Sequence, residues 1–413
     1  MDNGDTLKTS GWYQEMVIVP NPANAEQFYL FYIGVTSNTP GLYYSLIDLS
    51  YNGGLGRVIQ RNVQLQIHTM CDGLRAVKHG NGRDWWIVCK RYDISNNQFI
   101  LYQVNSSGIS GPFYQYAGAN SDVGFTRFEF SKDGEKLVLI NFQNLIELYS
   151  FDRCTGSMHL LRTIEHAYSS GPYPGLWSCA LSPESSKLYV TAILNGSNQD
   201  TSYLFQYDLT ATNITATKDT LYTFADPDYA GLLQRGPDDK IYLSCSMEFY
   251  DCEFFYLYCD TSYYPHNMNI SVINEPDSLD TLCDFQPYSF YLGGHRAYYG
   301  LPNNPNYELG PWINSICDTL TVGIDEPAIK IKDIQLKPNP AKTFTELHCN
   351  YLNGHHYTIA IRDLLGQLVY EKSGNINGDE LKLSIDARLL HPGIYVVSLS
   401  TELERVSSRL IIQ

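Results

Sequence analysis

A pattern that recurs about every fifty residues constrains the fold of this chain more than any other feature. Each copy has an apolar strand, a tight polar turn and a second strand rich in apolar and aromatic residues. The four clearest copies are RAVKHGNGRDWWIVC (75–89), RFEFSKDGEKLVLI (127–140), CALSPESSKLYVTAI (179–193) and LLQRGPDDKIYLSC (232–245). Their turns start 52, 51 and 54 residues apart, at His79, Ser131, Ser182 and Gly236. A fixed period of this length indicates a repeat architecture.

Two further strands follow the strand–turn–strand pattern, as in QFILYQV (98–104) and GPFYQYAG (111–118). Four short strands per unit at this period are typical of a β-propeller blade. One blade cannot bury both of its faces, so neighbouring blades must stack around an axis. A weaker copy at 16–33 precedes the four, and a partial copy at 289–304 follows them. The sequence therefore predicts an all-β chain with a propeller of about five to seven four-stranded blades.

Two points of the propeller stay open. A pair of β-sandwiches is the alternative fold, but sandwich turns recur about every 8 to 12 residues and show no period near fifty. No obvious N-terminal strand closes the ring. Either the partial copy at 289–304 pairs with residues 11–19, or the chain begins after its true first blade.

Composition excludes several classes of protein. Thirty-three Tyr and 17 Phe, against 17% charged residues, favour β structure with large half-buried surfaces. The formal charge of −16 and the lack of a basic stripe argue against a nucleic-acid partner. No apolar run is long enough to be a transmembrane segment, and residues 1–14 have no signal-peptide pattern.

The ten cysteines form no CxxC pair, so the spacing of a zinc or thioredoxin-like site is missing. They are interpreted either as small buried apolar residues or as a few disulfides formed in an oxidising compartment. For disulfides, the favoured set is Cys245, Cys252, Cys259, Cys283 and Cys317.

The texture of the sequence changes at Ile331. From there to the end, about seven short strands follow at the spacing of a sandwich. Apolar side chains alternate in Tyr357, Ile359 and Ile361 and again in Tyr395, Val397 and Leu399. The prediction is a small antiparallel Greek-key-like β-sandwich at 331–413. It follows a propeller at 1–305 and a linker at 306–330.

Four motifs of the tail occur in a specific order: LKPNPAKT, IRDLLGQLV, LHPGIYVVSL and the closing SRLIIQ. Together they resemble the type A C-terminal sorting domain of the type IX secretion system. The motif residues are Pro338, Asn339, Pro340, Asp363, Gly366, Gly393 and Tyr395, and Gly366 and Gly393 are expected at positive φ.

This resemblance implies that the tail addresses the protein to the type IX translocon and its sortase machinery. The domain would then be removed, and the protein would be anchored on the outer surface of a Gram-negative bacterium or released from it.

The propeller part is similar to uncharacterised exported propellers that precede such tails, in segments such as GGLGRV (53–58), FDRCTG (151–156) and YYGLPNNPNYELG (298–310). This group implies no activity for the chain. Its members begin with a Sec signal and an additional N-terminal segment, which are not seen here. We therefore expect this sequence to lack its native N-terminal segment.

No motif for catalysis, a metal or a cofactor is found: there is no G-x-S-x-G, H-E-x-x-H, P-loop or G-x-G-x-x-G after a strand. His355–His356 is interpreted as a solvated hairpin tip. Inner-strand positions of the blades align at Arg75, Arg127, Ser178 and Leu232. Arg75 and Arg127 are the predicted ligand-binding residues, for an anionic group at the channel, with ordinary ion pairs as the alternative.

The tryptophans Trp85 and Trp86 suggest stacking on a sugar. Strand alternation lets at most one of them serve, and packing between blades is the favoured interpretation. The sequence thus favours a non-enzymatic exported protein that binds a glycan or a protein. The alternative is a secreted hydrolase or lyase with its active site in the propeller channel.

Overall fold

The structure is a computed structural model. It describes residues 1–5, 7–9, 14–34, 40–91, 96–121, 124–166, 175–194, 201–225, 228–247, 265–295, 297, 300–318, 334–350, 356–363, 367–375, 380–401 and 405–412. The chain forms two compact units, Met1–Thr321 and Val322–Gln413.

The first unit contains five four-stranded antiparallel sheets within the described residues, each built from four consecutive strands. Blades 1 to 3 are β1 (Met16–Asn21), β2 (Asn24–Ile33), β3 (Leu42–Asp48) and β4 (Arg57–Gln66); β5 (Met70–Lys78), β6 (Trp85–Arg91), β7 (Asn96–Asn105) and β8 (Gly108–Ser121); and β9 (Thr126–Phe130), β10 (Lys136–Asn141), β11 (Ile146–Phe151) and β12 (Met158–Glu165).

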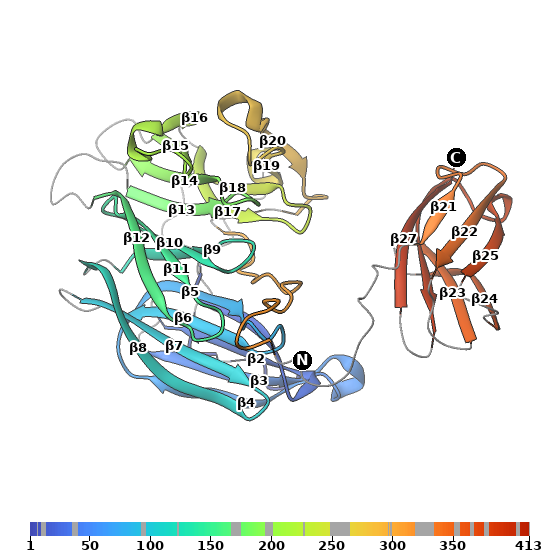
Figure 1. Ribbon diagram of the computed structural model, residues 1–413, viewed down its shortest axis with the longest axis horizontal. Coiled ribbons are helices and arrows are strands. Elements are labelled where there is room, and N and C mark those ends of the chain that lie inside the picture. The colour runs from blue at the N-terminus through green and yellow to red at the C-terminus, as the bar shows by residue number, and fades with distance from the viewer. Residues whose placement is uncertain are drawn as a thin grey trace. The chain divides into compact units, whose positions relative to one another are not determined.

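Two further blades complete the propeller, and Figure 1 shows the five sheets following one another in chain order, from blue to yellow. Blades 4 and 5 are β13 (Gly175–Leu181), β14 (Lys187–Leu194), β15 (Thr201–Asp208) and β16 (Asp219–Ala225); and β17 (Asp228–Arg235), β18 (Ile241–Met247), β19 (Asn269–Ile273) and β20 (Phe285–Tyr291). The helix α1 (Pro265–Met268) precedes β19, and short 3-10 turns lie at Asn52–Gly54, Thr215–Thr217 and Asp280–Cys283. The predicted β-propeller is confirmed.

The predicted repeat corresponds to the first two strands of a blade. The turns at His79, Ser131, Ser182 and Gly236 each connect an inner strand to the next strand outward. The backbone N–H of each of these residues donates to a carbonyl four or five residues ahead, as Ser131 N does to Lys136 O at 3.0 Å. The weak copy at 16–33 is β1 and β2. The described residues of the partial copy at 289–304 contain the end of β20 and no strand of a further blade.

Apolar side chains fill the spaces between consecutive blades. Among the described residues there are four such clusters in the propeller, one for each pair of neighbours in chain order: blades 1 and 2, 2 and 3, 3 and 4, and 4 and 5. Trp85 belongs to the first cluster and Trp86 to the second, with 1% and 4% of their surfaces exposed. Both tryptophans are therefore core residues, as the favoured interpretation of the sequence has it.

Residues 300–318, here called the strap, leave blade 5 and pack on blades 1 to 3. The Tyr307 Oη donates to Ile18 O at 2.9 Å, and Trp312 N donates to Gly80 O at 2.7 Å. Cys317 forms a disulfide with Cys154. Residues 306–318, which the sequence places in a linker, thus pack on the propeller, because their polar groups bond to its strands and turns.

The disulfide differs from the expected set, since Cys154 was not among the favoured residues. Six other cysteines of the described chain are all buried: Cys71, Cys89, Cys179, Cys245, Cys283 and Cys349. They behave as small apolar residues, which was the other interpretation. Cys252 and Cys259 lie outside the described residues.

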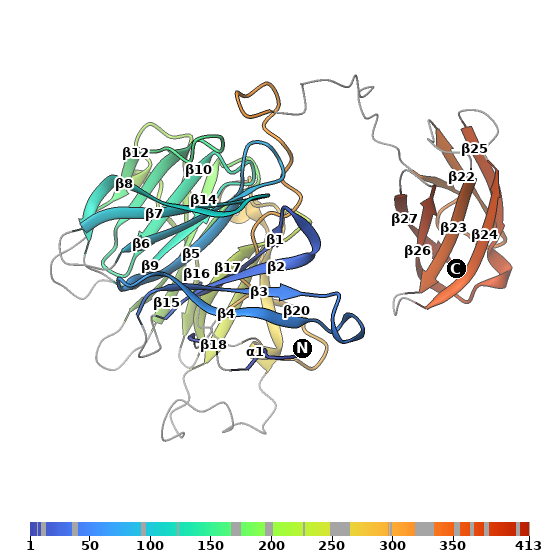
Figure 2. The ribbon, with the colours of Figure 1, turned by 90° about the horizontal axis from the view of Figure 1, so that it is seen from below.

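The second unit is a sandwich of two antiparallel sheets with one apolar core, seen in Figure 2 as well as in Figure 1. One sheet has the order β21 (Gln335–Lys337), β22 (Phe344–Asn350), β25 (Glu380–Asp386), and the other β24 (Leu368–Asn375), β23 (His356–Asp363), β26 (Gly393–Ser400), β27 (Arg405–Ile412). A 3-10 turn at Ala387–Leu389 precedes β26.

The alternation read from the sequence agrees with the burial in these strands. Tyr395, Val397 and Leu399 face the core, whereas Ile394 and Val396 are each 42% exposed.

Candidate functional site in the propeller channel

The inner strands β1, β5, β9, β13 and β17 surround the channel of the propeller. The end of the channel where these strands begin is called the upper end, and the other the lower end. Inner strands lie next to one another without sharing ladder hydrogen bonds, so their side chains and carbonyl groups must find partners across the channel. The polar residues predicted from the sequence lie here.

Arg75 of β5 lies almost fully buried, with 3% of its surface exposed. Its Nε donates to Phe128 O at 2.8 Å, and its two terminal nitrogens donate to the Glu129 carboxylate and the Asn303 side chain. Burial raises the pKa of Glu129, and the positive charge of Arg75 opposes that rise. Each of the three guanidinium nitrogens therefore has a partner inside the protein.

Arg127 of β9 is 2% exposed and lies near the upper end. It donates to Trp177 O, lies 4.5 Å from the centre of the Trp177 ring and forms an ion pair with Asp72 at 3.6 Å. Stacking on an aromatic face and pairing with a carboxylate are the two interactions that a guanidinium group makes best.

Asp72 is 1% exposed, and its Oδ1 accepts a hydrogen bond from Thr126 N at 3.0 Å. Burial raises the pKa of this carboxyl from its ordinary 3.8 to about 6, although the Arg127 charge and the Thr126 bond lower it. The cost of burying the carboxylate thus exceeds the benefit of its partners.

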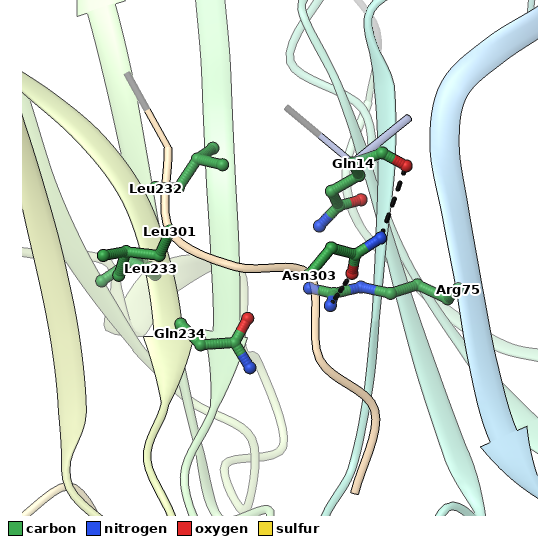
Figure 3. Close-up of a pocket in the computed structure, with 7 residues that line it drawn as sticks. All are labelled: Gln14, Arg75, Leu232, Leu233, Gln234, Leu301 and Asn303. Atoms are coloured by element: carbon green, nitrogen blue, oxygen red, sulfur yellow. Dashed lines mark hydrogen bonds between the residues drawn. The ribbon is translucent and has the colours of Figure 1, made fainter. Parts of the chain in front are cut away.

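Strap residues lie inside the channel between blade 5 and blades 1 and 2. Figure 3 shows Leu301 beside Leu232 and Leu233 of β17, and Asn303 beside Gln14 and Arg75. The Asn303 amide donates to Leu74 O at 2.7 Å, to Met16 O at 2.9 Å and to Gln14 O at 3.4 Å. Strap residues therefore form part of the lining of the small pocket in this figure.

Three aromatic rings lie close together at the upper end: Phe125 before β9, Phe142 after β10 and Trp177 in β13. Phe125 stacks on Trp177 with ring centres 6.5 Å apart, and Phe142 meets both rings edge-on or tilted at 5.9 to 6.4 Å. Phe125 is 51% exposed. In this set, called the aromatic cluster, the Phe125 ring is exposed and the Trp177 ring stacks on the Arg127 guanidinium group.

Sequence reasoning found Arg75 and Arg127 but missed the groups that bind them: Asp72, Glu129 and Asn303. Alternation along β9 offered a partial signal, because Arg127 and Glu129 are two residues apart and point to the same side. Asn303 lies in chain without periodicity, so no signal placed it in the channel.

The sorting-motif residues are held by hydrogen bonds within the sandwich. The Asn339 side chain donates to Arg409 O at 2.7 Å and accepts from Ile411 N at 2.9 Å, which joins the chain between Pro338 and Pro340 to β27. The Tyr395 Oη donates to His391 O at 2.8 Å.

Two other motif residues lie at strand ends: Asp363 is the last residue of β23 and Gly393 is the first residue of β26. The Asp363 Oδ1 accepts from Gln367 N at 2.9 Å. Gly393 does not have a positive φ, contrary to expectation, because it is already part of the extended ladder of β26. Gly366 and His355 lie outside the described residues.

The described part of the chain contains no group of three or more His, Cys, Asp or Glu side chains arranged to hold a metal ion. Its helices include none with the length and apolar character needed to cross a membrane.

Comparison with protein families identifies the second unit. Residues 335–413 match the family described as "Secretion system C-terminal sorting domain". The resemblance of the tail to a type IX sorting domain is thus confirmed, and the chain is a protein secreted through that system to the cell surface or beyond it. No curated protein matches the chain.

Solved structures give only distant similarity. A functionally unknown protein from Desulfotomaculum acetoxidans is 12% identical over 70% of this chain and 74% of its own, with a TM-score of 0.38. The periplasmic gluconolactonase PpgL of Pseudomonas aeruginosa is 12% identical over 62% of this chain and 64% of its own, with a TM-score of 0.37. GH43B of a Bacteroides ovatus xyloglucan PUL is 13% identical over 98% and 90%, with a TM-score of 0.35.

Proposed function

We propose that the propeller of this secreted protein binds a glycan outside the cell and does not catalyse a reaction. The sorting domain implies that the chain interacts with the type IX secretion machinery. We further propose that the producing cell is a Gram-negative bacterium and that the sortase machinery removes the domain after passage.

The aromatic cluster is the observation that supports binding. The Phe125 ring is 51% exposed, stacks on Trp177 and contacts Phe142. It therefore offers a preformed flat apolar surface. Pyranose rings present flat faces of C–H groups, which pack well on such a surface, and binding needs only a few oriented polar groups beside it.

The paired charges of the channel favour a neutral ligand over an anionic one. An anion at Arg75 or Arg127 would have to displace Glu129 or Asp72 from its arginine. The displaced carboxylate would then be buried without a partner, which costs several kcal/mol, roughly 3–5. We therefore assign ligand contact to the rings and a structural role to the two arginines.

The same pairing supports a binding protein over an enzyme. Enzymes lower reaction barriers by about 8 kcal/mol or more, which requires acids, bases or metals placed against the substrate. The carboxylates of Asp72 and Glu129 are instead engaged by arginines and backbone groups.

The alternative is a secreted hydrolase or lyase with its site in the channel, and one observation favours it. The pKa of Asp72, about 6, would suit a general acid near neutral pH. If this alternative holds, the purified protein should degrade a polysaccharide, and Asp72→Asn should abolish the reaction.

Titration calorimetry with a panel of neutral oligosaccharides tests the proposal. The variant Phe125→Ala removes the exposed ring of the cluster and should weaken binding by up to about tenfold, since stacking on a ring contributes about 0.5–1.5 kcal/mol. Tyr116→Ala is the matched control, because Tyr116 is 68% exposed on the outer strand of blade 2 and should be neutral. Equal losses in both variants, or binding unaffected by either, would contradict the assignment.

A further inference from the structure

The ring of blades has one join that differs from the others. Each blade is made of its own four consecutive strands, so no strand is shared between the first blade and the last. The four apolar clusters in the described propeller join blades that are neighbours in sequence, and none of them contains residues of both blade 5 and blade 1. Something else must hold these two blades together.

The strap lies at this join. Gly300 is so close to Leu232 of blade 5 that an added Cβ would lie 3.3 Å from its Cδ1. Three residues later, the Asn303 amide donates to Met16 O of blade 1 and to Leu74 O of blade 2. One short segment therefore contacts both sides of the join.

The strap then runs along blades 1 and 2 to the lower end of the channel. Tyr307 donates to Ile18 O at 2.9 Å, its own carbonyl accepts from Lys78 Nζ at 2.6 Å, and its ring meets Trp85 edge-on at 5.8 Å. Tyr307 and Leu309 pack on the edges of the first two apolar clusters.

The far end of the strap is fixed covalently. Gly310 O accepts from the Arg153 guanidinium group at 2.6 Å, and the disulfide joins Cys317 to Cys154 in the turn between β11 and β12. Both disulfide cysteines are half-buried at the surface, whereas the six other cysteines of the described chain are buried. Among the described cysteines, the disulfide is therefore the site that a reductant can reach.

We propose that the strap is a redox-controlled latch that closes the propeller ring. Without the disulfide, the strap is held mainly by hydrogen bonds to backbone carbonyl groups, each of which contributes only about 1 kcal/mol net. With the disulfide, the same hydrogen bonds form within the covalent loop that Cys154 and Cys317 close. The end of the strap then stays attached to blade 3. The latch thus decides whether Asn303 and Leu301 stay in the channel.

Closing the latch is a two-electron oxidation. The thiols of Cys154 and Cys317 lose two protons and two electrons as their S–S bond forms, and a protein or small-molecule disulfide takes up both to become a dithiol. Such oxidants act outside the cytoplasm, so the ring would close only after the chain has left it.

The disulfide of the latch also lies before the sorting domain in the sequence. Cys317 comes before residues 319–333, which lead to the sorting domain at 335–413. Cleavage in that stretch would remove the sorting domain and leave the strap tied at both ends.

Limited digestion with chymotrypsin, followed by mass spectrometry, tests the latch on the full chain. Chymotrypsin suits the strap, which contains Leu301, Tyr307, Leu309 and Trp312 but no Lys or Arg. Cleavage between 301 and 312 should be about tenfold faster or more in Cys317→Ser than in the oxidised wild type, because opening becomes local. Ile316→Ser is the matched control, since Ile316 is 91% exposed on the same strap and should cleave like the wild type.

Two results would overturn the proposal: equal cleavage rates in Cys317→Ser and wild type, or faster cleavage spread equally over all blades. If Cys317→Ser does not fold, the wild type reduced after folding and alkylated at Cys154 and Cys317 gives the same comparison. Faster cleavage of the strap alone in that sample supports the latch, and an unchanged rate excludes it.

Discussion

At the scale of single residues, the channel shows that a position can be predicted from sequence while its partners cannot. The repeat placed Arg75 and Arg127 on inner strands, where both are found. Their partners come from elsewhere in the chain: Asp72 from the preceding blade and Asn303 from the strap. Such pairing depends on three-dimensional contacts that one repeat cannot encode. From sequence alone, an arginine paired with a carboxylate therefore cannot be distinguished from an arginine that binds a ligand.

The pair of Arg127 and Asp72 gives the first prediction. Replacing Arg127 by Met leaves the Asp72 carboxylate buried without its opposite charge and removes the stack on Trp177. The free energy of unfolding should fall by about 3–5 kcal/mol. Urea denaturation measures this, with Arg57→Met as control: its ion pair with Asp2 is exposed, and it should change by about 0.5 kcal/mol or less. Similar losses in both variants would contradict the structural role.

A second prediction concerns the pH dependence caused by Asp72. Its pKa of about 6 in the folded protein lies above its ordinary 3.8, so between these values the folded chain keeps a proton that the unfolded chain has released. This group therefore adds stability as the pH falls through 6 toward 4. Asp72→Asn lacks this proton, so the advantage of wild type over the variant should be larger at pH 5 than at pH 7.5. Thermal melts at both pH values measure it, and a constant difference would argue against the raised pKa.

At the scale of elements, the sequence predicted what repeats and missed what occurs once. Turn residues recur at each inner hairpin because every blade makes the same chain reversal. This recurrence predicts the positions of the blades. The strap has no second copy and no alternation of apolar residues, so the sequence predicts a partial blade for its first part and a linker for its remainder. Its contacts are mostly side-chain bonds to backbone carbonyls, for which sequence carries little pattern.

The entry to the sandwich gives a third prediction. Asn339 bonds through its side chain to both Arg409 O and Ile411 N, and Ala341 N donates to Ile411 O at 2.8 Å. Asn339→Ala removes two of these three bonds and should lower the stability of the sandwich by about 1–2 kcal/mol. Lys342→Ala, an exposed change three residues away, is the control. Hydrogen exchange at Ile411 should accelerate only in Asn339→Ala; unchanged exchange there would show that the pairing of β27 does not need this side chain.

At the scale of the whole molecule, the two units have separate cores. Every residue of the sandwich cluster lies between Ile334 and Ile412, and each propeller cluster uses only earlier residues. The fourth prediction is that the isolated segment 331–413 folds by itself and unfolds in one cooperative transition. Calorimetry decides this, since a broad melt without an enthalpy peak would mean that the sandwich depends on the propeller.

The last prediction concerns delivery of the whole protein. The formal charge of −16 resides entirely in residues 1–334, because residues 335–413 contain eight Lys and Arg against eight Asp and Glu. With no net charge on this segment to steer it, we expect the secretion machinery to recognise the fold and motifs of the sorting domain. Deleting 331–413 from the full gene should leave a folded propeller in the periplasm and none outside the cell. Leu389→Ser, a change of a side chain 71% exposed, should still be exported. Immunoblots of the fractions measure both, and truncated protein outside the cell at wild-type levels would show that the propeller carries an address of its own.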